Sequence, residues 1–191
     1  REKYFYGRRF CVDERVLIPR YDTESVVEHA LVLARENGYK TALDLCCGSG
    51  VIGATLGAEG AFRTLCFADI SGGALTVARE NVRRLLPEQP ARFVQSDLLE
   101  NIDGPFDMLV CNPPYIGAED YAALEPQVKE YEPREALFAD HGGYAFYERL
   151  AKETPRVLSG NGALVLEIGD GQADRVCSLL NENGFVKIRW G

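Results

Sequence analysis

The stretch Asn112-Pro113-Pro114-Tyr115 combines residue types that could hold a reactive nitrogen. It follows the apolar run DMLVC, which predicts the end of a buried strand. Proline fixes φ near −65° and has no N–H, so the side-chain oxygen of Asn112 and the Pro113 carbonyl can together accept both hydrogens of a planar NH2 group. Tyr115 adds an aromatic face for that group. We interpret the stretch as a binding site for an amide or amine nitrogen, although Asn and Pro also form ordinary turns.

The glycine-rich turn DLCCGSG, which begins at Asp44, is the second candidate site. Gly48 and Gly50 let a ligand approach the backbone, and Asp69 follows Gly50 by 19 residues, a spacing typical of an acid that binds ribose hydroxyls. Gly48, Gly50 and Gly53 have the G-x-G-x-x-G spacing of a dinucleotide-binding turn, so the spacing alone leaves a dinucleotide possible. The Asp44 carboxylate would repel a pyrophosphate and favours an amine-bearing ligand. S-adenosylmethionine has a ribose and an amino group but no phosphate.

Strands and helices are expected to alternate around these stretches. The patterns predict strands at 41–47, 63–69, 91–97, 106–112, 162–168 and 185–190, and helices at 22–38, 48–60, 71–87, 144–159 (broken at Pro155) and 170–184. Such alternation predicts an α/β fold with a mostly parallel, doubly wound sheet, because each parallel crossover needs a helix. Ligands bind such sheets outside the carboxyl ends of the strands, where both candidate stretches lie. Turn-separated apolar stretches predict a β-hairpin within residues 1–20, and residues 21–191 are expected to form one domain.

Composition excludes several classes of function. The net charge of -8 and the absence of a basic cluster argue against direct nucleic-acid binding. His29 and His141 have no neighbours at metal-ligand spacing, so we expect no metal and a surface or packing role for His29. Six irregularly spaced cysteines without a CxxC pair are typical of reduced thiols in a cytoplasmic protein. No apolar run reaches membrane-spanning length, so we expect no membrane partner.

DLCCGSG, FAD and NPPY resemble, in order and spacing, motifs I, II and IV of the class I S-adenosylmethionine-dependent amino-methyltransferases, which have a Rossmann-like fold. The stretches VLIPRYDTE, YEPREALF and LEIGDGQ are similar to those of the HemK/PrmC family of peptide chain release factor N5-glutamine methyltransferases. The resemblance implies an enzyme that transfers a methyl group from S-adenosylmethionine to the glutamine side-chain nitrogen in the Gly-Gly-Gln motif of a release factor, leaving S-adenosylhomocysteine. It implies a cytoplasmic protein, which we expect to be a monomer.

The resemblance also implies roles for individual residues. Asn112, Pro113 and Tyr115 would be catalytic, and substrate binding would add Pro114, with Arg20 and Glu24 shaping the pocket. Cofactor binding would involve Asp44, Cys46, Cys47, Gly48, Ser49, Gly50, Asp69, Ile70, Asp97, Leu98 and Asn112. Cys46 replaces the first glycine of the family pattern, and a thiol that pointed at the ligand would narrow the pocket.

Other interpretations stay open. A ribosomal-protein glutamine methyltransferase resembles VDERVLIPR but normally lacks the following DTE, whereas a nucleic-acid N6-adenine methyltransferase shares NPPY. An inactive scaffold is a further alternative, and Glu167 is either a polar strand end or part of the site. The helical domain that precedes the hairpin in this family, and its last antiparallel strand, have no counterpart here. We therefore expect the intact protein to be longer at both ends.

Overall fold

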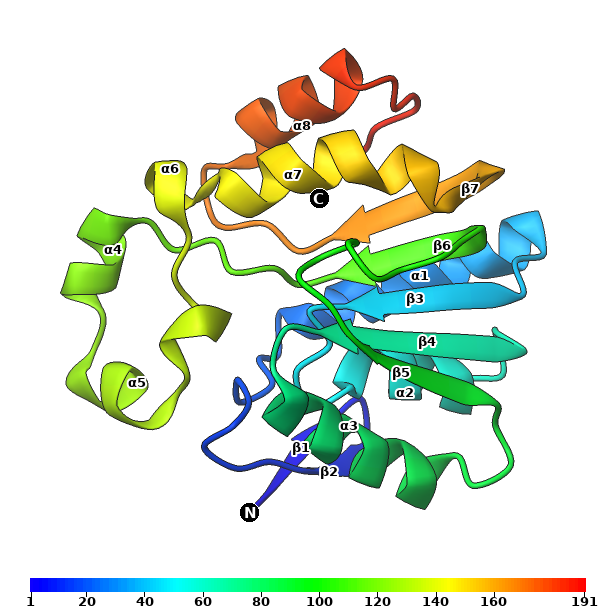
Figure 1. The fold of residues 1–191 in the computed structure, drawn as a ribbon, viewed down its shortest axis with the longest axis horizontal. Coiled ribbons are helices and arrows are strands. Elements are labelled where there is room, and N and C mark those ends of the chain that lie inside the picture. The colour runs from blue at the N-terminus through cyan, green and yellow to red at the C-terminus, as the bar shows by residue number, and fades with distance from the viewer.

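The computed structural model describes all residues 1–191, and its centre is a parallel five-stranded sheet with the strand order β5-β4-β3-β6-β7 (Figure 1). The strands are β3 (Thr41–Leu45), β4 (Thr64–Asp69), β5 (Ala91–Gln95), β6 (Phe106–Cys111) and β7 (Leu158–Leu166). From β3 the chain winds outward through β4 to β5 and then returns to β6 beside β3. The predicted doubly wound α/β sheet is therefore confirmed, with its switch point between β3 and β6.

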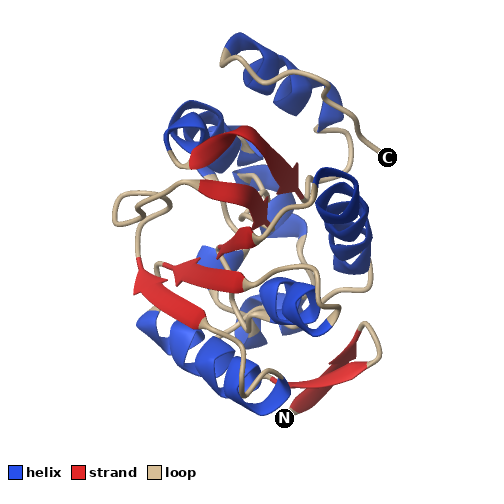
Figure 2. Cartoon of the chain, turned by 90° about the vertical axis from the view of Figure 1, so that its right-hand side faces the viewer, coloured by secondary structure: helices blue, strands red, loops and turns tan.

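Helices cover both faces of this sheet, as the side view shows (Figure 2). The five main helices are α1 (Thr23–Asn37), α2 (Val51–Ala58), α3 (Gly72–Leu85), α7 (Ala145–Glu153) and α8 (Ala173–Glu182). Successive residues of a strand point to opposite faces. Leu65 and Phe67 of β4 pack in the core with α1, α2 and α3, whereas Cys66 and Ala68 pack in a second core with Leu150 of α7. Both faces are buried, which explains the nearly continuous apolar runs.

Local signals explain several helix ends. Ser71 Oγ accepts a hydrogen bond from the Ala74 N–H at 3.2 Å and so caps the N-terminus of α3. Gly38 ends α1 with φ of 68°. Pro155 lies in a 3-10 turn directly after α7, which confirms the predicted break. Asp22 precedes α1 but makes no side-chain cap. No helix combines the length and apolar character that a bilayer crossing requires.

The N-terminal hairpin is present but shorter than predicted. Its strands are β1 (Glu2–Phe5) and β2 (Arg8–Cys11), joined by Tyr6 and Gly7, both with positive φ, as a two-residue hairpin turn requires. The prediction that the hairpin reaches residue 20 is wrong. Val16 N–H bonds back to the Asp13 carbonyl in a turn, and its apolar side chain packs in a small cluster against α3 rather than alternating along a strand.

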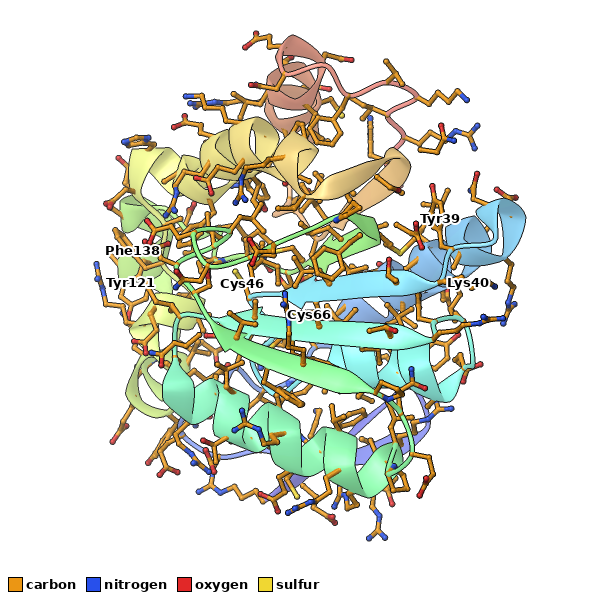
Figure 3. The ribbon with its side chains drawn as sticks, turned by 45° about the vertical axis from the view of Figure 1, so that its right-hand side comes forward. Tyr39, Lys40, Cys46, Cys66, Tyr121 and Phe138 are labelled. Atoms are coloured by element: carbon orange, nitrogen blue, oxygen red, sulfur yellow. The ribbon has the colours of Figure 1, made fainter.

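The segment 117–143 forms short helical elements that periodicity did not predict. They are α4 (Ala118–Ala123), α5 (Pro126–Tyr131), a 3-10 turn (Arg134–Ala136) and α6 (Asp140–Gly143). Elements of three to six residues are too short to show a helical period. Ile116 pairs in parallel with Phe138, which closes the segment at its base. The side-chain view shows Tyr121 and Phe138 at the end of the sheet opposite Tyr39 and Lys40, which precede β3 (Figure 3). The segment therefore stands beside the carboxyl ends of the strands.

The predicted strand at 185–190 is wrong. Residues 183–191 contain no strand, and β7 remains an edge of the sheet. Lys187 has φ of 58°, a left-handed conformation that interrupts extended backbone. Val186 and Trp190 are largely exposed, so the apolar residues that favoured a strand bury no face here.

Candidate active site

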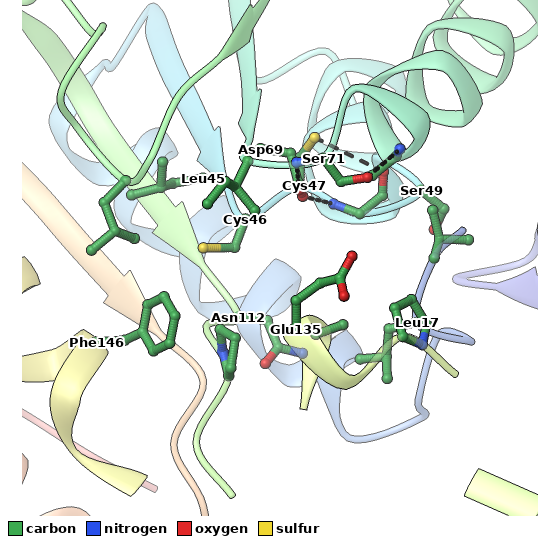
Figure 4. A pocket seen from close by; sticks show the side chains of 18 of the residues that line it. Leu17, Leu45, Cys46, Cys47, Ser49, Asp69, Ser71, Asn112, Glu135 and Phe146 are labelled. Carbon is green, nitrogen blue, oxygen red and sulfur yellow. Dashed lines mark hydrogen bonds between the residues drawn. The ribbon is translucent and has the colours of Figure 1, made fainter. Parts of the chain in front are cut away.

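A cavity of about 420 Å³ opens at the carboxyl ends of β3, β4 and β6 (Figure 4). It lies at the switch point, where ligand sites of such sheets are expected. Segments far apart in sequence meet there because parallel strands end at the same edge. Its lining includes Cys46, Cys47, Gly48, Ser49, Asp69, Ile70, Asp97, Leu98, Asn112, Pro114 and Arg20, all of which the sequence singled out. Asp44, Gly50, Pro113, Tyr115 and Glu24 do not line it.

The turn after β3 is built from left-handed residues. Cys46, Gly48 and Gly50 have φ of 53°, 51° and 76°. A Cβ on Gly48 would meet no protein atom within 4 Å, whereas a Cβ on Gly53 would lie 2.5 Å from the Phe67 ring. Gly53 therefore serves the close packing of α2 on the sheet. Cys46 adopts a conformation that suits glycine, and its half-buried side chain lies at the cavity wall.

Asn81 of α3 connects this turn to the hairpin, and sequence inspection missed it. Its fully buried side-chain amide donates from Nδ2 to the Ser49 carbonyl at 2.9 Å and to the Cys11 carbonyl at 3.0 Å. Its Oδ1 accepts from the Cys11 N–H at 2.7 Å. A polar residue inside a helix carries no local sign of such a role, because both partners come from other parts of the chain.

The carboxylate of Asp69 ends β4 and faces the cavity. It accepts the Gly48 N–H at Oδ2 and the Ser71 N–H at Oδ1, each at 2.9 Å. Burial raises the pKa of Asp69, the two backbone hydrogen bonds lower it, and the charge of Glu135 raises it further. Glu135 comes from the 3-10 turn of the segment 117–143 and lines the same cavity.

Asp44 was expected to contact the ligand directly, but it does not line the cavity. It is 2% exposed and lies beneath the turn, where Oδ2 accepts the Gly53 N–H at 2.8 Å and Oδ1 has no partner. Burial raises its pKa to about 8, an effect that the Gly53 hydrogen bond opposes and the charge of Asp69 reinforces. The carboxyl group anchors the first turn of α2 from below, outside the cavity lining.

In the corner formed by residues 112–115, two residues line the cavity, and the Tyr115 backbone is held by another segment. Asn112 and Pro114 line the cavity, and Asn112 Nδ2 donates to Oγ1 of the buried Thr23 at 3.3 Å. The Tyr115 carbonyl accepts from Gln172 Nε2 at 3.1 Å, and Gln172 Oε1 accepts the Gly169 N–H at 2.9 Å. The LEIGDGQ stretch thus holds the corner from behind.

Arg20 lines the cavity, whereas Glu24 does not. Arg20 Nη2 pairs with Glu132 Oε1 at 2.6 Å, and the Glu132 side chain, only 4% exposed, also accepts the Ile18 N–H at 3.2 Å. This pair joins the loop before α1 to the segment 117–143. Glu24 instead accepts the Tyr6 N–H at 2.8 Å, so its carboxylate is committed to the hairpin turn. The expectation that Glu24 shapes the pocket directly is therefore corrected.

Most of the cations around the cavity are already paired with carboxylates. Arg15 pairs with Asp13 and Arg149 with Asp97, in addition to the Arg20 pair. The guanidinium of Arg134 lies over the Phe138 ring, 3.9 Å from its centroid. Three of the four arginines in the lining are therefore paired with a carboxylate, Arg134 makes a ring contact and no ion pair, and the lining contains no lysine. Arg149 and Glu135 line the cavity although the sequence assigned no role to either of them, and Glu132 contributes through its pair with Arg20.

Comparisons with known proteins agree with this arrangement. The sequence profile described as "Methyltransferase small domain" matches residues 25–129. A release factor glutamine methyltransferase of Chlorobaculum tepidum is 40% identical over 95% of this chain and 65% of its own length. One from Lactococcus lactis is 39% identical over 96% of this chain and 67% of its own length. The chain thus spans just under two thirds of the first relative.

Solved structures support the fold. A ribosomal protein L11 methylase from Lactobacillus delbrueckii superposes with a TM-score of 0.57 at 22% identity, covering 90% of this chain and 75% of its own. A methyltransferase from Pyrococcus furiosus gives a TM-score of 0.64 at 16% identity, covering 94% and 77%. These are methyltransferase folds. With the sequence matches over nearly the whole chain, they lead to one conclusion: the chain belongs to the release factor glutamine methyltransferase family.

Proposed function

We propose that this protein transfers a methyl group from S-adenosylmethionine to the side-chain amide nitrogen of the glutamine in the Gly-Gly-Gln motif of a peptide chain release factor. One observation carries the proposal. Asn112 and Pro114 open into the same cavity as Asp69 and the turn at Gly48, so an amide site and a nucleoside site share one space. The names of the relatives support the substrate.

The residues at the cavity fit S-adenosylmethionine better than a dinucleotide. Asp69 retains acceptor capacity beyond its two backbone bonds, as a ribose diol requires. Ile70 and Leu98 supply apolar surface for a planar base, and the backbone beside Gly48 is open. Three of the four arginines of the lining are paired with carboxylates, so a pyrophosphate would find little unpaired positive charge. A volume of about 420 Å³ suits a ligand of this size.

Asn112 and Pro113 would position the substrate glutamine. A glutamine nitrogen is a weak nucleophile because its lone pair is delocalised, and the bound cofactor supplies a methyl group that its sulfonium already activates. Asn112 Oδ1 and the Pro113 carbonyl would accept the two hydrogens of the glutamine NH2 and stabilise the positive charge that develops on nitrogen. The nitrogen becomes acidic as it gains the methyl group, so its proton can leave to water without a strong base.

The proposal includes a protein partner and not a nucleic acid, because the net charge of -8 opposes a phosphate backbone. We also propose that the protein is a monomer and that residues 21–191 form one methyltransferase domain after the hairpin. It would act in the cytoplasm, where release factors work.

Mass spectrometry of a release factor tests the proposal. The release factor is incubated with this protein and S-adenosylmethionine, beside a ribosomal protein as an alternative glutamine substrate. A gain of one methyl group on the Gly-Gly-Gln glutamine is the expected result. Methylation of the ribosomal protein alone, or of neither while calorimetry shows cofactor binding, would overturn the proposed substrate.

A further inference from the structure

Glu135 carries a carboxylate that reaches into the cavity without a partner. It comes from the 3-10 turn of the segment 117–143, and its side chain points into the middle of the pocket (Figure 4). It faces the side of the pocket where Cys47, Asp69 and Ser71 lie. Both oxygens of Asp69 accept backbone N–H groups, whereas no hydrogen bond or ion pair of the protein includes the Glu135 carboxylate. All of its acceptor capacity is therefore available to a ligand.

The lining as a whole has more unpaired negative charge than unpaired positive charge. Three of its four arginines are paired with carboxylates, and Arg134 is its one guanidinium without an ion pair. Three carboxylates of the lining form no ion pair, and these belong to Asp69, Glu135 and Asp140. Opposite charges attract across a cavity more strongly than in bulk water. The cavity therefore favours a ligand that carries net positive charge.

The methyl donor and its product differ in net charge. At neutral pH S-adenosylmethionine carries a carboxylate, an ammonium and a sulfonium, whereas the sulfur of S-adenosylhomocysteine is neutral. The adenosine and the amino-acid groups are common to both, so contacts to them, including those expected of Asp69, do not distinguish the two. A carboxylate that no protein cation compensates does distinguish them, because it also attracts the sulfonium, which only the methyl donor has.

We propose that Glu135 is a specificity-determining residue whose carboxylate favours S-adenosylmethionine over S-adenosylhomocysteine through the charge of the sulfonium. This inference rests on the cofactor of the proposed function and not on its protein substrate. Glu135 enters from the segment 117–143 and Asp69 from the end of β4, so the two carboxylates approach the ligand from different sides of the pocket (Figure 4). The product lacks the attraction that the methyl donor had and leaves the cavity more readily, which limits inhibition by the product.

Titration calorimetry of Glu135→Gln with the two nucleosides tests this role. The variant keeps the shape of the side chain and removes its charge, so the affinity for S-adenosylmethionine should fall while that for S-adenosylhomocysteine stays unchanged. Because Glu135 is exposed, we expect the preference for the methyl donor to fall by about twofold to fivefold, as is typical of an exposed ion pair. Glu135→Lys reverses the charge and should lower the preference further. The matched control is Glu130→Gln, an exposed residue of α5 in the same segment that does not line the cavity.

Salt supplies a second readout, because mobile ions screen an exposed charge. Raising the ionic strength should lower the preference of the unmodified protein toward that of Glu135→Gln and change the preference of the variant less. An unchanged preference in both Glu135 variants would overturn the proposal. Equal losses of affinity for the two nucleosides would also overturn it, since Glu135 would then contact a group that both share. The titrations need no release factor, so a failure of methyl transfer would contradict the proposed function without affecting this result.

Discussion

Gly48 donates its backbone N–H to Asp69 Oδ2 at 2.9 Å, across 21 residues of sequence. This bond ties the turn after β3 to the end of β4, and Asp69 Oδ1 fixes the start of the next turn through Ser71. The acid that faces the cavity thus also holds its glycine-rich wall in place. Ligand contact and loop geometry depend on the same side chain.

Replacing Asp69 with Ala should therefore weaken cofactor binding strongly. Loss of hydrogen bonds to a charged group costs roughly 1.5–3 kcal/mol, which corresponds to about 10-fold to 100-fold in the dissociation constant for S-adenosylmethionine. Titration calorimetry measures this change. Asp103→Ala is the control, because Asp103 is exposed and outside the cavity lining. Unchanged affinity in Asp69→Ala would remove Asp69 from the ligand site.

Asn112→Ala should separate chemistry from cofactor binding. The variant loses the acceptor for the glutamine NH2, and removal of one such polar contact in a transition state lowers kcat by about 100-fold to 1,000-fold. Cofactor affinity should change little. Rapid-quench assays with a release factor and calorimetry with the cofactor give the two quantities, with the exposed Asn37→Ala as control. Normal turnover by Asn112→Ala would contradict the assigned role.

Cys46→Gly should improve cofactor binding with little change in stability. The left-handed backbone at Cys46 costs a side-chain residue roughly 1–2 kcal/mol, and the added freedom of an unfolded glycine offsets roughly 0.5–1 kcal/mol of that gain. Removal of the thiol widens the cavity wall, so the dissociation constant should fall severalfold. Cys177→Ala, in α8, controls for loss of a thiol elsewhere. Weaker binding in Cys46→Gly would show that the thiol contacts the ligand favourably.

Glu132→Ala should loosen the segment 117–143. The change removes the partner of Arg20 and leaves the Ile18 N–H without its acceptor, which we expect to cost roughly 2–3 kcal/mol of local stability. Hydrogen–deuterium exchange should then become faster at Ile18 and through α5. The matched control is the exposed Glu130→Ala in α5, which ends immediately before Glu132. Equal exchange in both variants would mean that the Arg20–Glu132 pair does not hold the segment.

Asp44 should make the protein less stable as pH rises. Its pKa is raised from 3.8 to about 8 in the folded state by burial. The folded state therefore keeps its proton where the unfolded chain has released it, and this contribution is fully present below pH 4 and is lost as pH rises toward 8. Urea unfolding of Asp44→Asn should show a weaker decline of stability between these limits than the unmodified protein. Parallel declines would contradict the assignment.

The sequence by itself determined the parallel α/β sheet, the order of its main helices and strands, and the positions of Asp69 and Asn112 at strand ends. Those features are local: hydrophobic period, caps such as Ser71, and breakers such as Pro155 act within a few residues. The strand at 185–190 was predicted wrongly because apolar composition does not show whether a segment stays extended and pairs, and the left-handed conformation of Lys187 interrupts this one. The hairpin was predicted too long because apolar residues after β2, such as Val16, pack individually against α3 and not along a strand.

Only the tertiary structure decided which of these groups face the ligand. Asp44 lies within β3 and Asp69 ends β4, yet only the fold shows that the first is buried beneath the turn at Gly48 and the second opens into the cavity. Arg20 and Glu132 are 112 residues apart, and the Glu167 N–H reaches the Cys111 carbonyl only because β7 pairs with β6. Long-range pairing of strands and burial set these relationships, and neither leaves a periodic trace in the sequence.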